Sequence, residues 1–449
     1  MAAPAPAVAP PAAPRPRATG LRWRSPGRAW PLWILTVGMP GLWILGLQGL
    51  AWALPGLVLG AGALRSRAAI PRRAAWLVLF CGWVLLGASM LRPAEYPLFL
   101  FRWFLFAGTL ACLVWIVNAS EGQLSTDRLV AWLAALWIVM VVFGFFALAF
   151  PAFDVRSPFQ LVAGPLGRIQ FVDDISRWRL AQFQTGQHVR LPRPAAPFAF
   201  TNGWGAGMAM LTPFFIRSWL IEVPRRRRRI GFCLLVASVG PILVSGNRGV
   251  WISLSASILY WTARRALQRD LRPLAAVVGM ALIVAIIFVV TPAGRLVTDR
   301  LHTSERSTDA RGSIYEEAWQ GTKQSPLLGN GKPGKNDNPA LPPVGTHGLM
   351  WYLLYVHGFV GLFLFLGWLV TEVVSSGWRI RSQGAWWAHL SLLIALIQMP
   401  YYGMQPQVVL IGVAAGIAYR ERARYPSRGD ATASLIPGAR GAAAPMLAR

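Results

Sequence analysis

Three basic side chains stand at the edges of apolar runs, where they could do chemistry. Arg193 closes a long polar stretch, Arg248 lies in a short polar turn between two apolar runs, and His347 stands where a second polar stretch ends. The planar guanidinium group of arginine suits phosphate oxygens. An imidazole, with an ordinary pKa of about 6.5, can take a proton from a hydroxyl group. Plainer explanations stay open, because Arg248 can snorkel or bond a neighbouring helix and His347 can be a polar anchor.

Other polar residues lie close to these three in the sequence. Arg190 precedes Arg193 within the same stretch, and Asn202 begins the next apolar run. An asparagine at such a position also serves as a helix cap. Arg311 follows Asp309 closely and can form a local salt bridge with it. We therefore keep Arg190, Asn202 and Arg311 as further candidates.

Long apolar runs must position these residues. Of the 449 residues, 55% are hydrophobic and only 14% are charged, and the mean hydropathy is +0.45. Soluble domains carry about 25% charged residues, so an ordinary soluble enzyme is excluded. The runs predict an all-α polytopic membrane protein with about 12 transmembrane helices. The alternating apolar and polar residues of an outer-membrane barrel are absent.

The expected membrane domain covers residues 30–419, between disordered tails at 1–29 and 420–449. Two long polar loops interrupt it, at 152–199 and 293–346. The second loop contains a stretch of helical pattern and is therefore expected to be partly helical. The expected spans lie near residues 30–46, 49–64, 74–91, 98–117, 129–151, 200–221, 230–245, 249–263, 273–292, 348–375, 386–403 and 407–419.

Positive charge is concentrated between the apolar runs. The chain has 44 lysines and arginines against 17 acids, a formal net charge of +27. Cytoplasmic loops are rich in these residues, so we place both tails and the segments 65–73, 222–229, 264–272 and 376–385 in the cytoplasm. The two long loops then lie on the extracytoplasmic side. Because the arginines concentrate in short loops between apolar runs, the charge indicates membrane orientation and argues against nucleic-acid binding. The arginine and alanine bias suggests a bacterium with a GC-rich genome, and we expect the protein in the bacterial inner membrane.

The sequence indicates no metal or cofactor site. Cys81, Cys112 and Cys233 all lie within apolar runs. No CxxC pair, nucleotide-binding glycine loop, HExxH or GxSxG motif occurs. Asp173 and Asp174 are adjacent and therefore point in different directions, which makes them a poor pair of metal ligands.

Four motifs occur together and in a fixed order. They are Arg193 with Asn202; Ser245-Gly246-x-Arg248-Gly249-x-Trp251; Asp309-x-Arg311 with Tyr315 and then Pro326-Leu327-Leu328-Gly329-x-Gly331; and His347 with Leu349, Gly358 and Gly361. With these motifs the chain resembles the O-antigen ligase/polymerase superfamily of bacterial membrane glycosyltransferases. Two positions depart from the family, which usually has asparagine where Gly348 stands and often has an acid where His357 stands.

The resemblance implies a metal-independent, inverting transfer of a glycan from a polyprenyl (undecaprenyl) diphosphate carrier to an acceptor hydroxyl at the extracytoplasmic face. The partners are then a lipid-linked glycan donor and a lipid or glycan acceptor, without a cofactor. Arg193 and Arg248 would bind the diphosphate, and His347 would orient or deprotonate the acceptor. Three further residues would contact substrate: Arg311, Arg190 and Asn202. A ligase and a repeat-unit polymerase both remain open.

A membrane transporter or a lipid-linked oligosaccharide flippase is the alternative. Such a protein needs charged or broken-helix sites near the membrane midplane. Arg102 and Glu372 are the main charged candidates there. The other polar residues concentrate in the two long loops, which favours the transferase.

Overall fold

Helices dominate the part of the chain that the structure, a computed structural model, describes. Outside that part lie residues 1–28 and 425–449, Arg190 and most of the expected span 273–292. The described residues are 29–183, 191–272, 274–275, 277–279, 282, 305–336, 342–378, 380 and 382–424.

Five helical segments are long and apolar enough to cross a membrane: Arg72–Met90, Pro93–Asn118, Thr126–Ala149, Arg225–Ser245 and Leu349–Gly377. They contain α4 (Ala75–Leu86), α5 (Tyr96–Asn118), α6 (Thr126–Ala149), α10 (Arg225–Ser245) and α15 (Leu349–Gly377). Four further long helices pack with them: α9 (Thr201–Trp219), α11 (Arg248–Leu267), α16 (Gln383–Gln398) and α17 (Val408–Arg424). The protein is thus a mostly helical membrane protein, and the total of 12 spans remains a prediction.

The first expected pair of spans is broken into short pieces. The pieces are α1 (Trp30–Thr36), α2 (Met39–Leu45), a 3-10 helix at Leu50–Ala53, a π-helical segment at Pro55–Leu59, and α3 (Gly60–Arg65). Pro40 and Pro55 lack the backbone N–H that a continuous helix uses, and Gly46 ends α2 with a φ of 77°. The tip of the pair docks on the first long loop, where Gln48 Nε2 donates to the carbonyl oxygen of Arg177 at 3.2 Å.

The first long loop is folded and adds short strands to the expected all-helical architecture. Its elements are β1 (Asp154–Val155), α7 (Pro158–Val162), a short 3-10 turn (Gly164–Arg168), α8 (Gln170–Ser176), β2 (Trp178–Arg179), β3 (Ala181–Phe183) and β4 (Pro192–Pro194). β1 pairs with β2, and β3 pairs with β4, both in antiparallel register. The β3–β4 pair sets Arg193 opposite Gln182.

The second long loop packs against a break in α15. α14 (Glu305–Gln324) covers the stretch with helical pattern, and Tyr315 stacks on Trp351 with ring centroids 4.6 Å apart. α15 is interrupted at Gly358, which has a φ of 69° and a ψ of −174°. Backbone amides of Asn330 and Gly331 donate, each at 3.0 Å, to carbonyl oxygens just before the break. The Pro326–Gly331 motif therefore satisfies backbone groups that the broken helix leaves open.

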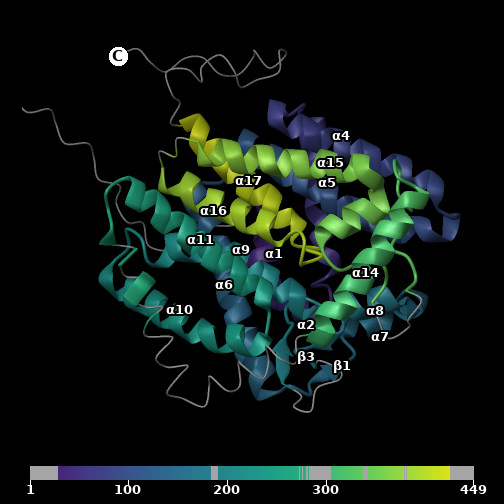
Figure 1. The fold of residues 1–449 in the computed structure, drawn as a ribbon, viewed down its shortest axis with the longest axis horizontal. Helices are drawn as coiled ribbons and strands as arrows, with labels where there is room; N and C mark the ends of the chain where they lie inside the picture. The colour runs from purple at the N-terminus through teal and green to yellow at the C-terminus, as the bar shows by residue number, and fades with distance from the viewer. Residues whose placement is uncertain are drawn as a thin grey trace, which may run out of the picture.

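The bundle has two unlike ends. One end, the loop face, carries residues 150–183, 191–200, 305–336 and 342–348 and the connection 399–407. α14, α7, α8 and β1 gather on that side, at the lower right of Figure 1. The other end, the arginine face, carries the connections 66–71, 119–125 and 220–224 and the carboxyl-terminal ends of α11 and α17. Its described arginines are Arg65, Arg67, Arg72, Arg73, Arg128, Arg217, Arg225, Arg226, Arg227, Arg228, Arg229, Arg264, Arg265, Arg269, Arg272, Arg420, Arg422 and Arg424.

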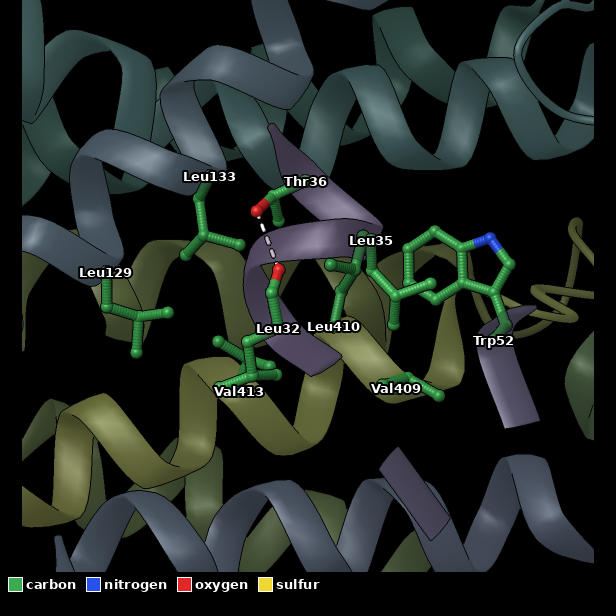
Figure 2. Close-up of a pocket in the computed structure, with 9 residues that line it drawn as sticks. All are labelled: Leu32, Leu35, Thr36, Trp52, Leu129, Leu133, Val409, Leu410 and Val413. Carbon is green, nitrogen blue, oxygen red and sulfur yellow. Dashed lines mark hydrogen bonds between the residues drawn. The ribbon is translucent and has the colours of Figure 1, made fainter. Parts of the chain in front are cut away.

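The core between the two faces is tightly packed and apolar. Trp137 stacks on Phe215 with ring centroids 3.8 Å apart. The core holds a cavity of about 10 Å³, and Figure 2 shows the residues that line it. Among them, the Thr36 hydroxyl donates to the carbonyl oxygen of Leu32 at 2.7 Å. That volume is about the size of a water molecule. The cavity therefore has no room for a lipid tail, and it lies in the packed core.

Candidate functional site

Arg193 is held against the turn that presents Arg248. Strand β4 carries Arg193, whose Nε donates to the carbonyl oxygen of Ser245 at 2.6 Å. Its Nη2 donates to Oδ1 of Asn247 at 2.9 Å. The motif with Arg193 is thus joined to the motif with Arg248, more than 50 residues later in the chain, by two hydrogen bonds from a charged side chain.

Asn247 is the centre of this junction. Its side chain is only 2% exposed, and its Nδ2 donates to the carbonyl oxygen of Thr201 at 3.0 Å. The Thr201 hydroxyl in turn donates to the carbonyl oxygen of Arg193 at 3.1 Å. A Cβ atom on Gly205 would lie 2.8 Å from Asn247 Nδ2, so only glycine lets α9 approach this closely. β4, α9 and the turn before α11 therefore form one fixed unit.

Arg248 stands at the first position of α11 and is partly exposed at the loop face. α10 ends at Gly246, which has a φ of 60°, and this left-handed residue reverses the chain. The amino-terminal end of α11 consequently points toward the loop face. Helix amino termini attract anions, so the dipole of α11 and the charge of Arg248 act in the same direction.

Tyr402 joins this turn to the segment that carries His347. The backbone N–H of Val250 donates to the Tyr402 hydroxyl at 3.1 Å, and the N–H of Leu349 donates to the carbonyl oxygen of Tyr402 at 2.7 Å. A Cβ atom on Gly249 would lie 2.7 Å from the Tyr402 ring. The connection 399–407 therefore holds the Arg248 turn and the His347 segment in fixed relative positions. The sequence alone assigns no role to this connection.

His347 is partly buried at the start of α15. Gly348 follows with a φ of 101°, a conformation that glycine adopts without strain. A Cβ atom at this position would lie 2.4 Å from the carbonyl oxygen of Pro400, so the asparagine that is usual in the family does not fit this conformation. The connection 399–407 packs closely against the residue before His347, since a Cβ atom on Gly403 would lie 2.8 Å from the carbonyl oxygen of Thr346.

For the other three candidates, Asn202, Arg311 and Arg190, the structure shows fewer contacts. Asn202 is the second residue of α9, and its side chain forms no hydrogen bond with the described residues. It does not cap the helix: the N-cap position belongs to Phe200, and the N–H of Thr201 donates to Gln182 Oε1 at 2.8 Å. Arg311 lies on α14, where only its backbone is described. Arg190 falls outside the described residues.

The acids of the first long loop are engaged in ion pairs with arginines of the same loop. Asp154 contacts both Arg177 and Arg179, and its hydrogen bond raises the pKa of Arg177. Asp173 pairs with Arg177, Asp174 pairs with Arg179, and burial raises the pKa of Asp174. In the described part of the chain, no three His, Cys, Asp or Glu side chains come together as metal ligands.

Comparison with known proteins finds a matching family model. Residues 233–366 match the family model described as O-antigen ligase. The matched stretch includes the Arg248 turn, Arg311 and His347, but it ends before Tyr402 and begins after Arg193. No curated protein matches the chain. The family match confirms the chain's resemblance to the O-antigen ligase-related superfamily.

Proposed function

We propose that this protein transfers a glycan from a polyprenyl (undecaprenyl) diphosphate carrier to an acceptor hydroxyl, as a ligase or a repeat-unit polymerase of surface polysaccharides. One observation carries the proposal. The connection 399–407 links the turn that presents Arg248 to the segment that presents His347, both at the loop face. The O-antigen ligase match over residues 233–366 supports this class of reaction.

In this proposal Arg248 and Arg193 bind the donor diphosphate. Two nitrogens of Arg193 hold the turn at Ser245 and Asn247, so Arg193 also fixes the position of Arg248. Negative charge grows on the diphosphate as the bond to the sugar breaks. Preorganised cations and the amino terminus of α11 stabilise that charge, which lowers the barrier to transfer.

His347 orients or deprotonates the acceptor hydroxyl. The acceptor oxygen attacks the anomeric carbon from the side opposite the diphosphate, the bond from that carbon to the diphosphate oxygen breaks, and the configuration inverts. Because arginines neutralise the leaving anion, the proposed reaction uses neither a metal nor a cofactor. Three residues are proposed to make further contacts with the substrates: Arg311, Arg190 and Asn202.

The loop face is proposed to lie outside a bacterial inner membrane, with both termini in the cytoplasm. The arginines at 225–229 and those of the connections 65–73 and 264–272 all lie at the opposite face. Lys and Arg are retained on the cytoplasmic side of membrane proteins. A lipid-linked donor flipped to the outer leaflet would therefore meet Arg248 and His347 there.

A lipid-linked oligosaccharide flippase is the second candidate, because α15 has the kind of break that transporters use. In flippases and transporters such breaks line a cavity. Here the break at Gly358 is covered by chain: the N–H of Phe359 donates to the carbonyl oxygen of Pro326 at 2.8 Å. This covering favours the transferase.

The test is a reaction of the purified full-length protein with polyprenyl-diphosphate oligosaccharides from its own source, in the presence of EDTA, with the products sized. A ladder of repeats identifies a polymerase, and a single transfer to an added acceptor identifies a ligase. Absence of transfer with every native donor and acceptor, together with passage of labelled lipid across reconstituted vesicles, would replace the proposal by the flippase.

A further inference from the structure

Arg102 is a cation inside a membrane-spanning segment. It lies six residues after the start of α5 at Tyr96, which places it about 9 Å along the helix axis from the loop face. The start of α5 is itself tied to the second long loop, since Glu95 pairs with Lys332. A charged side chain at membrane depth is costly unless a partner compensates it.

The surroundings of Arg102 provide no counter-charge. Its guanidinium carbon lies 5.2 Å from the ring centroid of Phe171 on α8, and its Nε is buried without a hydrogen-bond partner. No carboxylate of the described residues pairs with it. Its electrostatic neighbours on α15 are Tyr352 and His357, neither of which carries negative charge in its ordinary form.

Further polar groups around Arg102 lack partners. The amide of Gln405, which contacts Tyr352, has a buried Nε2 without a hydrogen-bond partner. His357 is 2% exposed, neither ring nitrogen has a hydrogen-bond partner, and the rings of Phe80, Phe106 and Tyr352 lie edge-on to it at 5.6 to 6.0 Å. Buried donors are nearly always satisfied in proteins, so these groups favour an acceptor that the described residues do not supply.

This group adjoins the candidate site on its membrane side. Gln405 belongs to the same connection as Tyr402, which holds the turn before Arg248. Tyr352 lies on the first turns of α15, directly after His347. The phosphate head of a lipid that enters the candidate site from the membrane would therefore come close to Arg102 and Gln405.

We propose that Arg102 and Gln405 form an anion subsite for a lipid-borne phosphate at the membrane side of the candidate site. The phosphate belongs either to the polyprenyl diphosphate carrier or to the headgroup of an anionic phospholipid. The inference rests on the proposed function. A fixed guanidinium and an amide donor supply the charge-assisted hydrogen bonds that such a group requires.

The experiment measures binding without turnover. Full-length protein in phosphate-free maltoside detergent is titrated with undecaprenyl diphosphate, with undecaprenol and with phosphatidylglycerol, and complexes are counted by native mass spectrometry. Arg102→Gln is expected to weaken binding of the phosphate lipid about tenfold and to leave undecaprenol binding unchanged. Arg102→Lys keeps the charge and is expected to lose about threefold.

Two variants control for a structural role. Phe171→Leu removes the ring beneath the guanidinium and keeps the charge, so we expect binding within twofold of the wild type. Arg217→Gln removes an arginine of the arginine face, which pairs with Asp127 and Glu222, and is expected to change nothing. If Arg102→Gln fails to fold, Gln405→Ala removes the other donor and is expected to weaken binding about threefold.

The results distinguish failure of the Arg102 subsite from failure of the proposed transferase function. Selective loss of undecaprenyl diphosphate binding places the donor at Arg102, and selective loss of phosphatidylglycerol binding places a membrane lipid there. Wild-type binding that Arg102→Gln and Gln405→Ala leave unchanged overturns the subsite alone. A wild-type protein that binds no undecaprenyl diphosphate, even though it is folded, contradicts the proposed function as well.

Discussion

At the scale of single residues, the candidate site depends on neutral groups that hold the charged ones. Asn247 satisfies both Arg193 and Thr201, and Tyr402 accepts from Val250 and from Leu349 through its hydroxyl and its carbonyl oxygen. Neither residue carries charge. Their part in the site follows from position, because each bridges two segments that are distant in the sequence.

Tyr402→Phe keeps the ring and removes the hydroxyl that Val250 N–H uses. Leaving a buried N–H unsatisfied costs about 1–3 kcal/mol, so we expect a lower melting temperature and reduced turnover with a normal level of protein. Thermal unfolding in detergent and glycan-transfer assays measure both. Tyr401→Phe is the matched control, since Tyr401 is 39% exposed; equal effects of the two substitutions would contradict this role of Tyr402.

Asn247→Ala removes the acceptor of Arg193 and the donor to Thr201 at once. We expect the Arg248 turn to lose its fixed position, so that kcat falls at least tenfold while the apparent affinity for the acceptor changes little. Steady-state kinetics with donor and acceptor varied separately test this. Unchanged kcat in a folded variant would show that the junction is not needed for transfer.

At the scale of elements, the second long loop and α15 depend on each other. The break at Gly358 exposes carbonyl groups, and residues 326–331 supply the donors that satisfy them. Backbone hydrogen bonds therefore join the motif that contains Pro326–Gly331 to the motif that contains His347 and Gly358. α14 directly precedes residues 326–331, so this contact also positions α14 and its residue Arg311 at the loop face.

Gly358→Ala tests that coupling. A side chain at a φ of 69° is strained, and the new Cβ atom would overlap the carbonyl group of Leu327. We expect a loss of several degrees in the melting temperature and faster proteolysis of the second long loop. Gly367→Ala on the same helix is the control, because a Cβ atom there meets nothing closer than 3.8 Å; similar behaviour of both variants would refute the coupling.

Sequence patterns locate the apolar helices and the charged candidates, but not the way they meet. The positions of α5, α6 and α15 follow from runs of apolar residues. The breaks between residues 30 and 65 occur at Pro40, Gly46 and Pro55, but the sequence does not show that this segment docks on the first long loop through Gln48. The Arg193–Asn247 contact and the Tyr402 bridge join distant segments, and no local periodicity encodes such contacts.

At the scale of the whole molecule, the two faces differ in what they carry. The loop face holds the folded loops, the Arg248 turn and His347, and the arginine face holds most of the described arginines. This division supports a site that works on one side of a membrane, with packed helices between it and the other side.

Cysteine labelling in intact cells tests the orientation. In a variant without native cysteines, Val162→Cys, at a position 83% exposed in the first long loop, is expected to react with an impermeant maleimide. Arg226→Cys, at an exposed position of the arginine face, is expected to react only after the cells are opened. The reverse pattern would place the candidate site in the cytoplasm.

The central claim is that Arg248 and His347 act together on one lipid-linked donor and its acceptor. The most direct measurement is glycan transfer by purified Arg248→Ala and His347→Ala variants, compared with the wild type and with Arg217→Ala as a control from the arginine face. We expect each site variant to lose at least 100-fold in kcat, since each removes a group that acts in the transition state, and the control to keep wild-type activity. Wild-type transfer by both site variants, at normal protein levels, would contradict the account.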